Sequence, residues 1–359
     1  MSSAPLRIAV TADPELPVPP SHYGGIERII AMLVEGLVGR GHDVCLFAHR
    51  DSRVPCMLVP YPGTRSGSRR DTVRNAAAIV TTLKGRPVNV VHSFGRLAYL
   101  LPLLPWPLPK IMSYQRAVTA RSARFGHVLS RGTLHFTGCS RHLIEQVSAC
   151  GSWHVVYNGV PVGRYAFRPV VDAVAPLVFL GRIEHIKGTH LAIEVAKRSR
   201  RTLIIAGNVP EQAEHQEYFR SRIQPAIDGR TIVYVGPVDD RQKSELLGSA
   251  AALLMPILWD EPFGIVMAEA LACGTPVVAL RRGSVPEVVD DGTTGFVCDT
   301  TDRMVEAVGR LAMLDRARCR QAAEARFSDT AIVDGYEALY RCLIAPENEG
   351  AGDRHPIEA

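Results

Sequence analysis

Two cations five residues apart give the first chemical signal in this sequence. Arg182 and Lys187 lie in a segment bounded by glycines, Gly181-Arg182-Ile183-Glu184-His185-Ile186-Lys187-Gly188. A guanidinium binds two phosphate oxygens side by side, and an ammonium adds a point charge. A helical pattern starts just after the segment, and the N-terminus of a helix favours anions. The segment therefore predicts a diphosphate site, with a turn flanked by a solvated arginine and lysine as the alternative.

Two carboxylates with seven residues between them give the second signal. Glu261 and Glu269 enclose Pro262-Phe263-Gly264-Ile265-Val266-Met267-Ala268, where the proline and glycine indicate a helix start. Glu269 then falls in an apolar helix, where a buried carboxylate needs a partner, and it could accept hydrogen bonds from ribose hydroxyls. Glu261 could bind a sugar from the loop. The alternatives are a partnered helix acid and a solvated loop acid.

The same helix start supplies backbone donors. The first amides of a helix have no acceptor within the helix, so those of Phe263, Gly264 and Ile265 could bind phosphate or sugar oxygens.

Three weaker signals lie in the first half of the chain. Gly24 and Gly25 follow a strand-like run and open a helical pattern, so the backbone could pass close to a phosphate or sugar. His92 ends an apolar run and could contact the acceptor or the sugar, although a structural histidine is the common alternative. Gln115 follows the next strand-like run, on the same predicted rim.

Several other site classes are not indicated. There is no D-x-D, no C-x-x-C and no G-x-S-x-G, and the histidines His185, His190 and His215 lack ligand spacing. We therefore expect no metal site and no serine nucleophile. The eight cysteines are scattered, which favours buried free thiols. No aromatic residues are interleaved with the basic ones, so we expect no nucleic-acid partner.

The charge is distributed unevenly along the chain. Residues 1–165 hold 19 Lys and Arg against 8 Asp and Glu, and residues 166–359 hold 22 against 28. The basic half could face an anionic acceptor or a membrane surface, while solvated surface is the alternative. One cationic face near Trp106 could be formed by Arg65, Arg69, Arg70, Arg74, Arg116, Arg121, Arg124 and Arg131. No apolar run is long enough to span a bilayer, so we expect a cytoplasmic protein. The cationic face could bring it to the inner face of the membrane, with solvated loops as the alternative.

Short apolar runs and helical patterns alternate along the whole chain. Strands are predicted at 6–11, 43–47, 88–92, 110–112, 134–137, 154–157, 177–180, 202–206, 232–235, 252–255, 277–279 and 295–297. Helices are predicted at 26–39, 71–83, 140–150, 189–198, 211–226, 241–249, 264–273, 285–289 and 302–314. This alternation indicates parallel sheets with helices on both faces.

The predicted fold class is α/β, with two doubly wound Rossmann-like domains facing across a cleft. Residues 1–165 form the first domain and residues 166–330 the second. A C-terminal helix over 331–345 could cross back to the first domain, and residues 346–359 form a polar tail. Loops after the strands are then the places for chemistry, because open α/β sheets bind ligands at the carboxyl ends of their strands.

Together these features resemble glycosyltransferase family 4, a group of retaining transferases with the GT-B fold. The match rests on Gly24-Gly25, the Arg182/Lys187 loop, the E-x7-E pair Glu261 and Glu269, and Tyr157-Asn158-Gly159-Val160 at the predicted domain join. The segments Gly283-Ser284-Val285-Pro286-Glu287 and Asp291-Gly292-Thr293-Thr294-Gly295-Phe296 are also typical of the family. The resemblance spans nearly the whole chain and is strongest over residues 176–300.

The resemblance implies that residues 1–165 form the acceptor-side domain and residues 166–330 the nucleotide-sugar donor domain. It also implies a role for each matching residue. Arg182 and Lys187 would hold the diphosphate of a UDP-sugar or GDP-sugar donor. Glu269 would bind the ribose and Glu261 the transferred sugar. The other donor contacts would come from Gly24, Gly25 and the amides of Phe263, Gly264 and Ile265. Such enzymes usually transfer the sugar to an acceptor hydroxyl, on a glycan, a lipid or a small molecule, without a divalent metal.

One departure from the family concerns the sugar site. Many members carry a histidine after the fourth strand, where this chain has Ser113-Tyr114-Gln115. Gln115 can donate to a sugar hydroxyl but cannot carry a proton, and His92 is a candidate substitute. Two other functions stay open: a sugar-nucleotide epimerase, and a non-catalytic sugar-nucleotide-binding protein. The cationic loop together with the two glutamates favours transfer.

Overall fold

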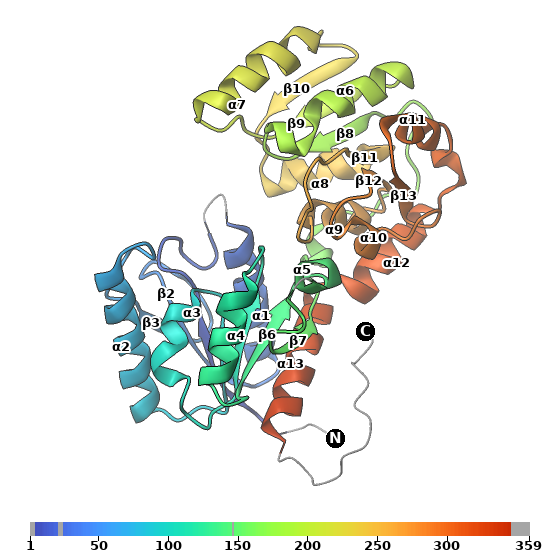
Figure 1. Cartoon of the computed structure of the whole chain (residues 1–359). Coiled ribbons are helices and arrows are strands. Elements are labelled where there is room, and N and C mark those ends of the chain that lie inside the picture. The colour runs from blue at the N-terminus through green and yellow to red at the C-terminus, as the bar shows by residue number, and fades with distance from the viewer. Residues whose placement is uncertain (1–3, 21–23, 146, 346–359) are drawn as a thin grey trace. The chain divides into compact units, whose positions relative to one another are not determined.

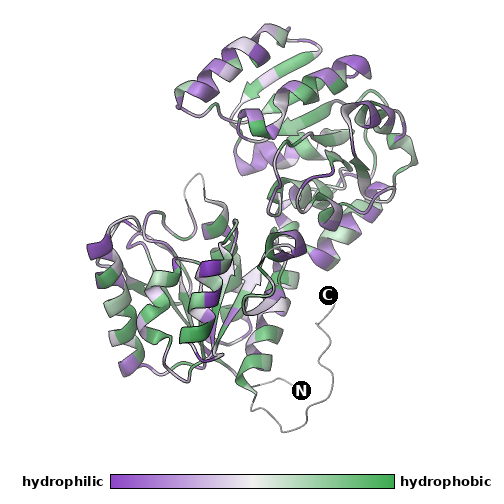
Figure 2. Cartoon of the chain, viewed as in Figure 1, coloured by the Kyte–Doolittle hydropathy of each residue, from purple (hydrophilic) through white to green (hydrophobic). Residues whose placement is uncertain are grey.

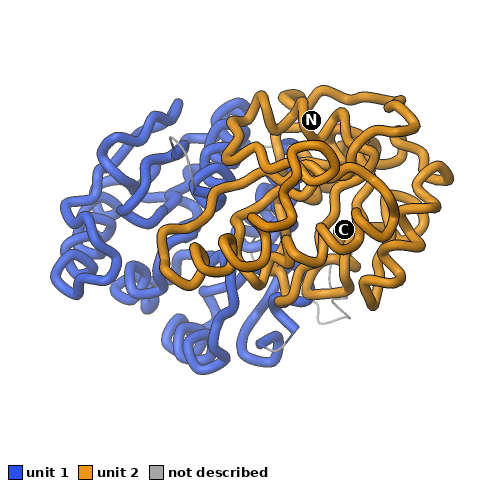
Figure 3. The backbone as a smooth tube through the Cα atoms, turned by 90° about the horizontal axis from the view of Figure 1, so that it is seen from above, with its two compact units in different colours: residues 1–158, 329–359 blue, residues 159–328 orange. Residues whose placement is uncertain are grey.

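The computed structural model describes residues 4–20, 24–145 and 147–345 of the chain, and the predicted tail, 346–359, lies outside them. The chain divides into two compact units (Figure 3). The N-terminal unit comprises residues 1–158 and 329–359, and the C-terminal unit comprises residues 159–328. Each unit has its own parallel sheet and its own buried core.

The N-terminal unit is built on a seven-stranded parallel sheet in the order β3-β2-β1-β4-β5-β6-β7. The strands are β1 (Arg7–Thr11), β2 (Asp43–Ala48), β3 (Met57–Pro60), β4 (Val90–Ser93), β5 (Lys110–Tyr114), β6 (Leu134–Gly138) and β7 (Ser152–Val155). The helices are α1 (Gly25–Gly39), α2 (Arg69–Gly85), α3 (Leu97–Leu100), η1 (Leu101–Leu103), α4 (Ala120–Leu129), α5 (Arg141–Glu145) and α13 (Asp329–Ile344), most of them labelled in Figure 1.

Both faces of this sheet are covered, so every residue of its central strand β4 is buried. Successive side chains of a strand point to opposite faces. Val91 packs in the cluster that includes Ile79 of α2 and Tyr99 of α3. His92, the next residue, faces the other side and contacts Tyr336 of α13.

Helix α13 closes the N-terminal unit by packing against α1. Gly36 permits the approach, because a Cβ there would lie 2.4 Å from a methyl carbon of Val333. Arg40, just after α1, forms ion pairs with Asp334 at 2.6 Å and Glu337 at 2.8 Å. The last described helix of the chain is therefore part of the N-terminal unit.

The C-terminal unit has a six-stranded parallel sheet in the order β10-β9-β8-β11-β12-β13. The strands are β8 (Leu177–Leu180), β9 (Leu203–Ala206), β10 (Ile232–Gly236), β11 (Ala252–Met255), β12 (Val277–Leu280) and β13 (Gly295–Cys298). The helices are η2 (Val162–Arg164), η3 (His185–Lys187), α6 (Thr189–Arg198), α7 (Ala213–Tyr218), η4 (Phe219–Ile223), η5 (Gln224–Ala226), α8 (Asp240–Ser249), α9 (Ile265–Ala272), α10 (Val285–Val288), α11 (Thr301–Gly309), η6 (Leu311–Met313) and α12 (Arg316–Arg326).

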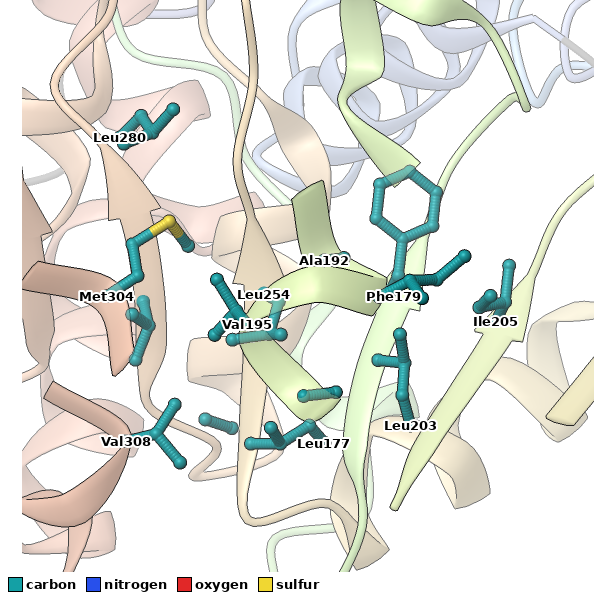
Figure 4. Packing of buried hydrophobic residues seen from close by; sticks show 14 of the residues in the cluster. Leu177, Phe179, Ala192, Val195, Leu203, Ile205, Leu254, Leu280, Met304 and Val308 are labelled. Atoms are coloured by element: carbon teal, nitrogen blue, oxygen red, sulfur yellow. The ribbon is translucent and has the colours of Figure 1, made fainter. Parts of the chain in front are cut away.

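The core of the C-terminal unit forms where helices cover this sheet. Figure 4 shows one cluster of buried side chains, with Phe179 of β8 and Leu203 of β9 at the right of the view and Met304 and Val308 of α11 at the left. Figure 2 shows hydrophobic residues concentrated on the strands and mixed with hydrophilic residues on the helices. This is the pattern of a sheet buried on both faces by amphipathic helices.

The two parallel sheets confirm the predicted pair of doubly wound domains. The prediction missed β3, α3, α4 and α12, and it placed β7 two residues too late. The helix predicted over 211–226 is instead α7 followed by the π-helical turn η4 and the short η5, which contains Pro225. A proline lacks the amide that a continuous helix needs. The helix predicted over 140–150 is described as α5 only up to Glu145.

The units divide at 158/159 and 328/329, whereas the sequence prediction divides them at 165/166 and 330/331. Residues 159–165 belong to the C-terminal unit because their contacts lie there. The Val160 amide donates to the Phe327 carbonyl at 2.8 Å, and the Tyr165 hydroxyl donates to Glu269.

Candidate active site

The sheet of the C-terminal unit reverses its strand order between β8 and β11. The chain builds outward from β8 to β9 and β10, and on the other side from β11 to β12 and β13. Open α/β sheets bind ligands off the carboxyl ends of their strands at such a switch point. The loops there are residues 181–188 and 256–264, and they carry most of the predicted donor-binding residues.

The loop after β8 is packed tightly against the loop after β11. Gly188 has a φ of 74°, and a Cβ there would lie 1.9 Å from the carbonyl oxygen of Pro256. The Leu258 amide donates to the Ile186 carbonyl at 2.8 Å. Only glycine tolerates both the left-handed backbone and this approach. The packing places Lys187 beside the loop that carries Glu261.

Lys187 and Glu261 form one ion pair, although the sequence analysis assigned them to different parts of the donor. The distance from Lys187 Nζ to Glu261 Oε2 is 2.6 Å. Trp259 Nε1 donates to the same oxygen at 3.1 Å, and Lys187 Nζ lies 4.9 Å from the Trp259 ring centre. The side chains remain 20% and 13% exposed. The pair is therefore accessible at the surface of the unit.

The backbone of Glu261 is held from the loop after β12. The Ser284 amide donates to the Glu261 carbonyl at 2.9 Å, and the Gly283 amide donates to Asp260 Oδ1 at 3.1 Å. A Cβ on Gly283 would lie 2.4 Å from the Glu261 nitrogen. This explains structurally why a glycine begins the Gly283-Ser284-Val285-Pro286-Glu287 segment.

Arg182 lies in the same loop as Lys187 but is held differently. Its guanidinium pairs with Glu184 at 2.9 Å, and its side chain is exposed whereas that of Glu184 is buried. A buried carboxylate that fixes an exposed cation orients the guanidinium before any ligand arrives.

Helix α9 begins where the sequence places it. Gly264 precedes its first residue with φ 74° and ψ 65°, a left-handed conformation that favours glycine. The Phe263 side chain is buried, with its ring 5.7 Å from the ring of Phe327. Phe263 thus anchors the turn through its side chain, and Ile265 opens the helix, whose first amides have no acceptor within it.

Glu269 lies in α9, buried as predicted from its apolar surroundings, with two donors on one carboxylate oxygen. Lys243 Nζ lies 2.5 Å and the Tyr165 hydroxyl 2.8 Å from Oε1. Burial and the neighbouring Glu269 raise the pKa of Tyr165. Burial alone would lower the pKa of Lys243, but the carboxylates of Glu269 and Asp240 outweigh it and raise that pKa.

Tyr165, Lys243 and Trp259 also contact these carboxylates but were not predicted as site residues. The one available clue was that a carboxylate in the apolar run of α9 needs a partner. Lys243 is 26 residues from Glu269 and Tyr165 is 104, and no spacing rule links them. Trp259 stands two residues before Glu261 and could have been included as part of the same loop.

The N-terminal unit has its own switch point between β1 and β4. Gly24 caps α1 with φ 151°, and a Cβ there would lie 2.8 Å from Glu27 Oε2. Gly25 is the first residue of α1. Asp13 follows β1, and burial together with Glu15 raises the pKa of Asp13 to about 6. The glycine pair therefore opens a helix beside carboxylates, a feature that the sequence did not reveal.

His92 does not fit the predicted contact with acceptor or sugar. It is completely buried, with Nδ1 2.6 Å from the Tyr340 hydroxyl and Nε2 2.6 Å from the Ser113 hydroxyl. Burial lowers the pKa of His92 to about 3. The physical reason is strand alternation, which turns this side chain towards α13. We therefore assign His92 to the core of the N-terminal unit and leave it out of the site.

Gln115 follows β5 and is half-buried. Its side-chain oxygen accepts a hydrogen bond from Asn158 Nδ2 at 2.7 Å. This bond fixes which end of the amide is the donor end. The glutamine is thus oriented by the asparagine of the Tyr157-Asn158-Gly159-Val160 motif.

Other features of the described residues bear on the remaining predictions. Residues 4–20, 24–145 and 147–345 hold no cluster of three His, Cys, Asp or Glu side chains suited to a metal. No described helix has the length and apolar character needed to cross a membrane. Five of the eight free cysteines are buried, but Cys342 is exposed, which corrects the expectation of buried thiols at that position.

Comparison with known families identifies both units. The model for "Glycosyltransferase Family 4" matches residues 23–164, and the model for "Glycosyl transferases group 1" matches residues 173–326. An alpha-maltose-1-phosphate synthase from Mycobacterium tuberculosis is 32% identical, covering 90% of this chain and 92% of that protein. A glycogen synthase from the same species is 28% identical, covering 86% and 87%.

A solved structure shares the fold. HepE from Anabaena, in complex with UDP-glucose, superimposes with a TM-score of 0.70 at 17% identity, covering 94% of this chain and all of that one. Two parallel sheets with these strand orders, each matched by a model of the same family, are the two halves of the GT-B fold. The chain therefore belongs to glycosyltransferase family 4 and is a glycosyltransferase with the GT-B fold.

Proposed function

We propose that the protein is a retaining glycosyltransferase that moves a sugar from a nucleotide-sugar donor to a hydroxyl acceptor. The observation that carries this is the accessible Lys187–Glu261 pair, with Nζ and Oε2 2.6 Å apart, at the switch point of the C-terminal unit. A cation and a carboxylate in contact offer complementary sites for the diphosphate and the hydroxyls of one donor.

Binding of the diphosphate would rearrange this pair. The Lys187 ammonium would bind phosphate oxygens in place of Glu261. The Glu261 carboxylate could then accept hydrogen bonds from the transferred sugar. Arg182 and the first amides of α9, near Phe263, Gly264 and Ile265, would add positive charge. Fixed donors aimed at a leaving group stabilise the charge that develops as its bond breaks. We propose that these groups replace a divalent metal.

Retention of the anomeric configuration is part of the same proposal. The engagement of Glu261 with Lys187 and Trp259 supports a reaction in which this carboxylate does not attack the sugar. In the proposed reaction the acceptor oxygen attacks the anomeric carbon on the face that the diphosphate leaves. The departing diphosphate takes the acceptor proton, so that atoms and charge balance without a separate base.

The predicted contributions of the N-terminal unit are part of the same proposal. Gly24 and Gly25 would allow the backbone to lie close to the donor, and Gln115 would donate its amide hydrogens to a sugar hydroxyl. The bond from Asn158 supports this role for Gln115, because it occupies the carbonyl end of the amide.

We propose a UDP-sugar as donor, with a GDP-sugar as the alternative. The HepE structure contains UDP-glucose, which supports uridine. Thermal-shift measurements with UDP, GDP and ADP should show stabilisation by at least one of them, because ligand affinity adds to the free energy of unfolding. The matching nucleotide sugars should then show transfer or slow hydrolysis.

The products separate the candidate functions. Release of the nucleoside diphosphate with retained anomeric configuration supports the proposal. Conversion of the donor into its epimer without release would identify an epimerase. Tight binding with no turnover of any donor would identify a binding protein.

A peripheral membrane contact is supported by one helix of the N-terminal unit. Helix α4 exposes Phe125, Val128 and Leu129, with relative accessibilities of 53%, 66% and 45%, next to Arg121 and Arg124. Apolar and cationic residues on one helix suit the surface of an anionic bilayer. Flotation with phosphatidylserine vesicles should capture the protein at low salt and release it at high salt. Failure to bind at low salt would end this part of the proposal.

A further inference from the structure

The carboxylate of Glu269 is held in an unusual way for a side chain in an apolar helix. Its neighbours in α9 are buried and apolar, so the charge must be compensated from outside that helix. Lys243 of α8 and Tyr165, just after η2, provide the compensation. Neither is part of the E-x7-E motif.

Both donors converge on the same oxygen. Lys243 Nζ is 2.5 Å and the Tyr165 hydroxyl 2.8 Å from Oε1. Among the described residues, no hydrogen bond to Oε2 accompanies these two. An ionised carboxylate can accept about four hydrogen bonds over its two oxygens. The arrangement therefore fixes the rotamer of Glu269 through one oxygen and keeps the other available.

The two donors are themselves fixed. Arg320 of α12 donates to the carbonyl of Tyr165 at 2.9 Å and to that of Ala272, the last residue of α9, at 2.8 Å. This clamp joins Tyr165 to the helix that carries Glu269. Lys243 Nζ also contacts Asp240 at 3.2 Å and lies 5.8 Å from the Tyr165 ring centre.

We infer that Tyr165 and Lys243 are positioning residues that orient the Glu269 carboxylate so that Oε2 receives the vicinal hydroxyls of the donor ribose. This inference rests on the proposed function, in which Glu269 binds ribose. The burial of Tyr165 and its contact with Glu269 raise its pKa, so its hydroxyl stays protonated and remains a donor. A ribose that lacks those hydroxyls cannot form hydrogen bonds with Oε2, so the orientation of Glu269 does not affect its binding.

The test compares two forms of one nucleotide. UDP and 2′,3′-dideoxy-UDP are titrated by calorimetry into the full chain and into Tyr165→Phe, Lys243→Met and Glu269→Gln. GDP or ADP and their dideoxy forms replace the uridine pair if thermal shift selects that base. Wild type should bind the ribo form about 30-fold more tightly, as expected for hydrogen bonds to a charged group.

Tyr165→Phe and Lys243→Met should reduce this ratio to about 5-fold or less, while the affinity for the dideoxy form stays within about 3-fold of wild type. Adding Tyr165→Phe to Glu269→Gln should have no further effect on the ratio, because the carboxylate it orients is gone. Tyr336→Phe, which removes another buried, hydrogen-bonded hydroxyl, should keep the full ratio. Tyr165→Phe changes one hydroxyl and is the variant to interpret if Lys243→Met fails to fold.

The outcomes separate this inference from the proposed function. If wild type binds none of the three diphosphates, the proposed function fails. If wild type prefers the ribo form and both variants keep the full preference, Tyr165 and Lys243 only stabilise the fold and the inference is wrong. Equal loss of affinity for the ribo and dideoxy forms would also overturn it.

Discussion

The two units share a topology but use the polar residues of their central strands and loops differently. In the N-terminal unit, His92, Ser113 and Tyr340 satisfy one another inside the core. In the C-terminal unit, Lys187 and Glu261 lie in loops and remain partly exposed. A polar residue within a strand is committed to packing, whereas one in the loop beyond the strand stays accessible to a ligand. Position relative to the strand end therefore separates the buried polar residues of this comparison from the accessible ones.

The largest effect is expected when Lys187, the cation of the Lys187–Glu261 pair, is removed. Lys187→Ala should lower kcat/KM by about 10³-fold, on the order of 4 kcal/mol, because the leaving diphosphate loses its ammonium contact. Steady-state kinetics with the active donor measures this. Lys197→Ala, at the other end of α6, is the control. Unchanged affinity for nucleoside diphosphate in both Lys187→Ala and Arg182→Ala would remove the basis of the proposed donor site.

Changing Glu261, the carboxylate of the same pair, should affect kcat without weakening the binding of nucleoside diphosphate. Glu261→Gln should lower kcat by about 10²-fold, roughly 3 kcal/mol, while nucleoside diphosphate binds as well as before or more tightly. The reason is that Glu261 competes with the diphosphate for Lys187, with which it is paired at 2.6 Å. Kinetics and calorimetry on the same preparation provide the two numbers. A large loss of diphosphate affinity would show that Glu261 does not compete in this way.

A change in the buried network of His92, Ser113 and Tyr340 should alter the stability of the protein and not its activity. His92→Leu should lower the free energy of unfolding by about 2 kcal/mol, because the hydroxyls of Tyr340 and Ser113 lose a buried partner. The activity per folded molecule should stay within about 3-fold of wild type. Urea unfolding and kinetics at low temperature measure both, with His142→Leu on α5 as the control. A catalytic defect without loss of stability would return His92 to the site.

The smallest effect, taken per pH unit, is a difference in how the free energy of unfolding depends on pH. Burial holds the pKa of His92 near 3 in the folded chain, against about 6.5 when unfolded. The unfolded state therefore binds the proton first, so His92 contributes full stability above pH of about 6.5 and loses it as the pH falls towards 3. Between pH of about 6 and 4, wild type should lose roughly 1.4 kcal/mol per pH unit more than His92→Leu. If the free energy of unfolding depended on pH in the same way in the two proteins, the assignment of His92 as a buried, neutral side chain would be wrong.

Much of the fold could be predicted because apolar runs and helical periodicity indicate strands and helices locally. The apolar runs of β8 and β11 and the helical face of α6 coincide with the predicted ranges. Helix α4 escaped prediction because its apolar residues Phe125, Val128 and Leu129 face outwards and are mixed with arginines. A core-facing helix shows its apolar residues on one face and its charged residues on the opposite face, and this segment lacks that separation.

The residue types of the candidate site could be predicted, but which side chains contact each other could not. Gly188, Gly264 and Gly283 each occupy a backbone position with positive φ, and the sequence marks them directly. The pairing of Lys187 with Glu261 joins residues 74 positions apart, and that of His92 with Tyr340 joins residues 248 apart. The order of strands in the sheet brings Lys187 to Glu261, and the packing of helix α13 brings Tyr340 to His92.

By itself, the sequence determined the alternation of strands and helices, the two glycine-bounded loops and the chemical groups that they carry. Only the tertiary structure decided that His92 turns into the core and that Tyr165 and Lys243 share one oxygen of Glu269. The physical reason is that residue type and spacing fix local backbone geometry. Burial and hydrogen-bond partners depend on which elements pack against each other.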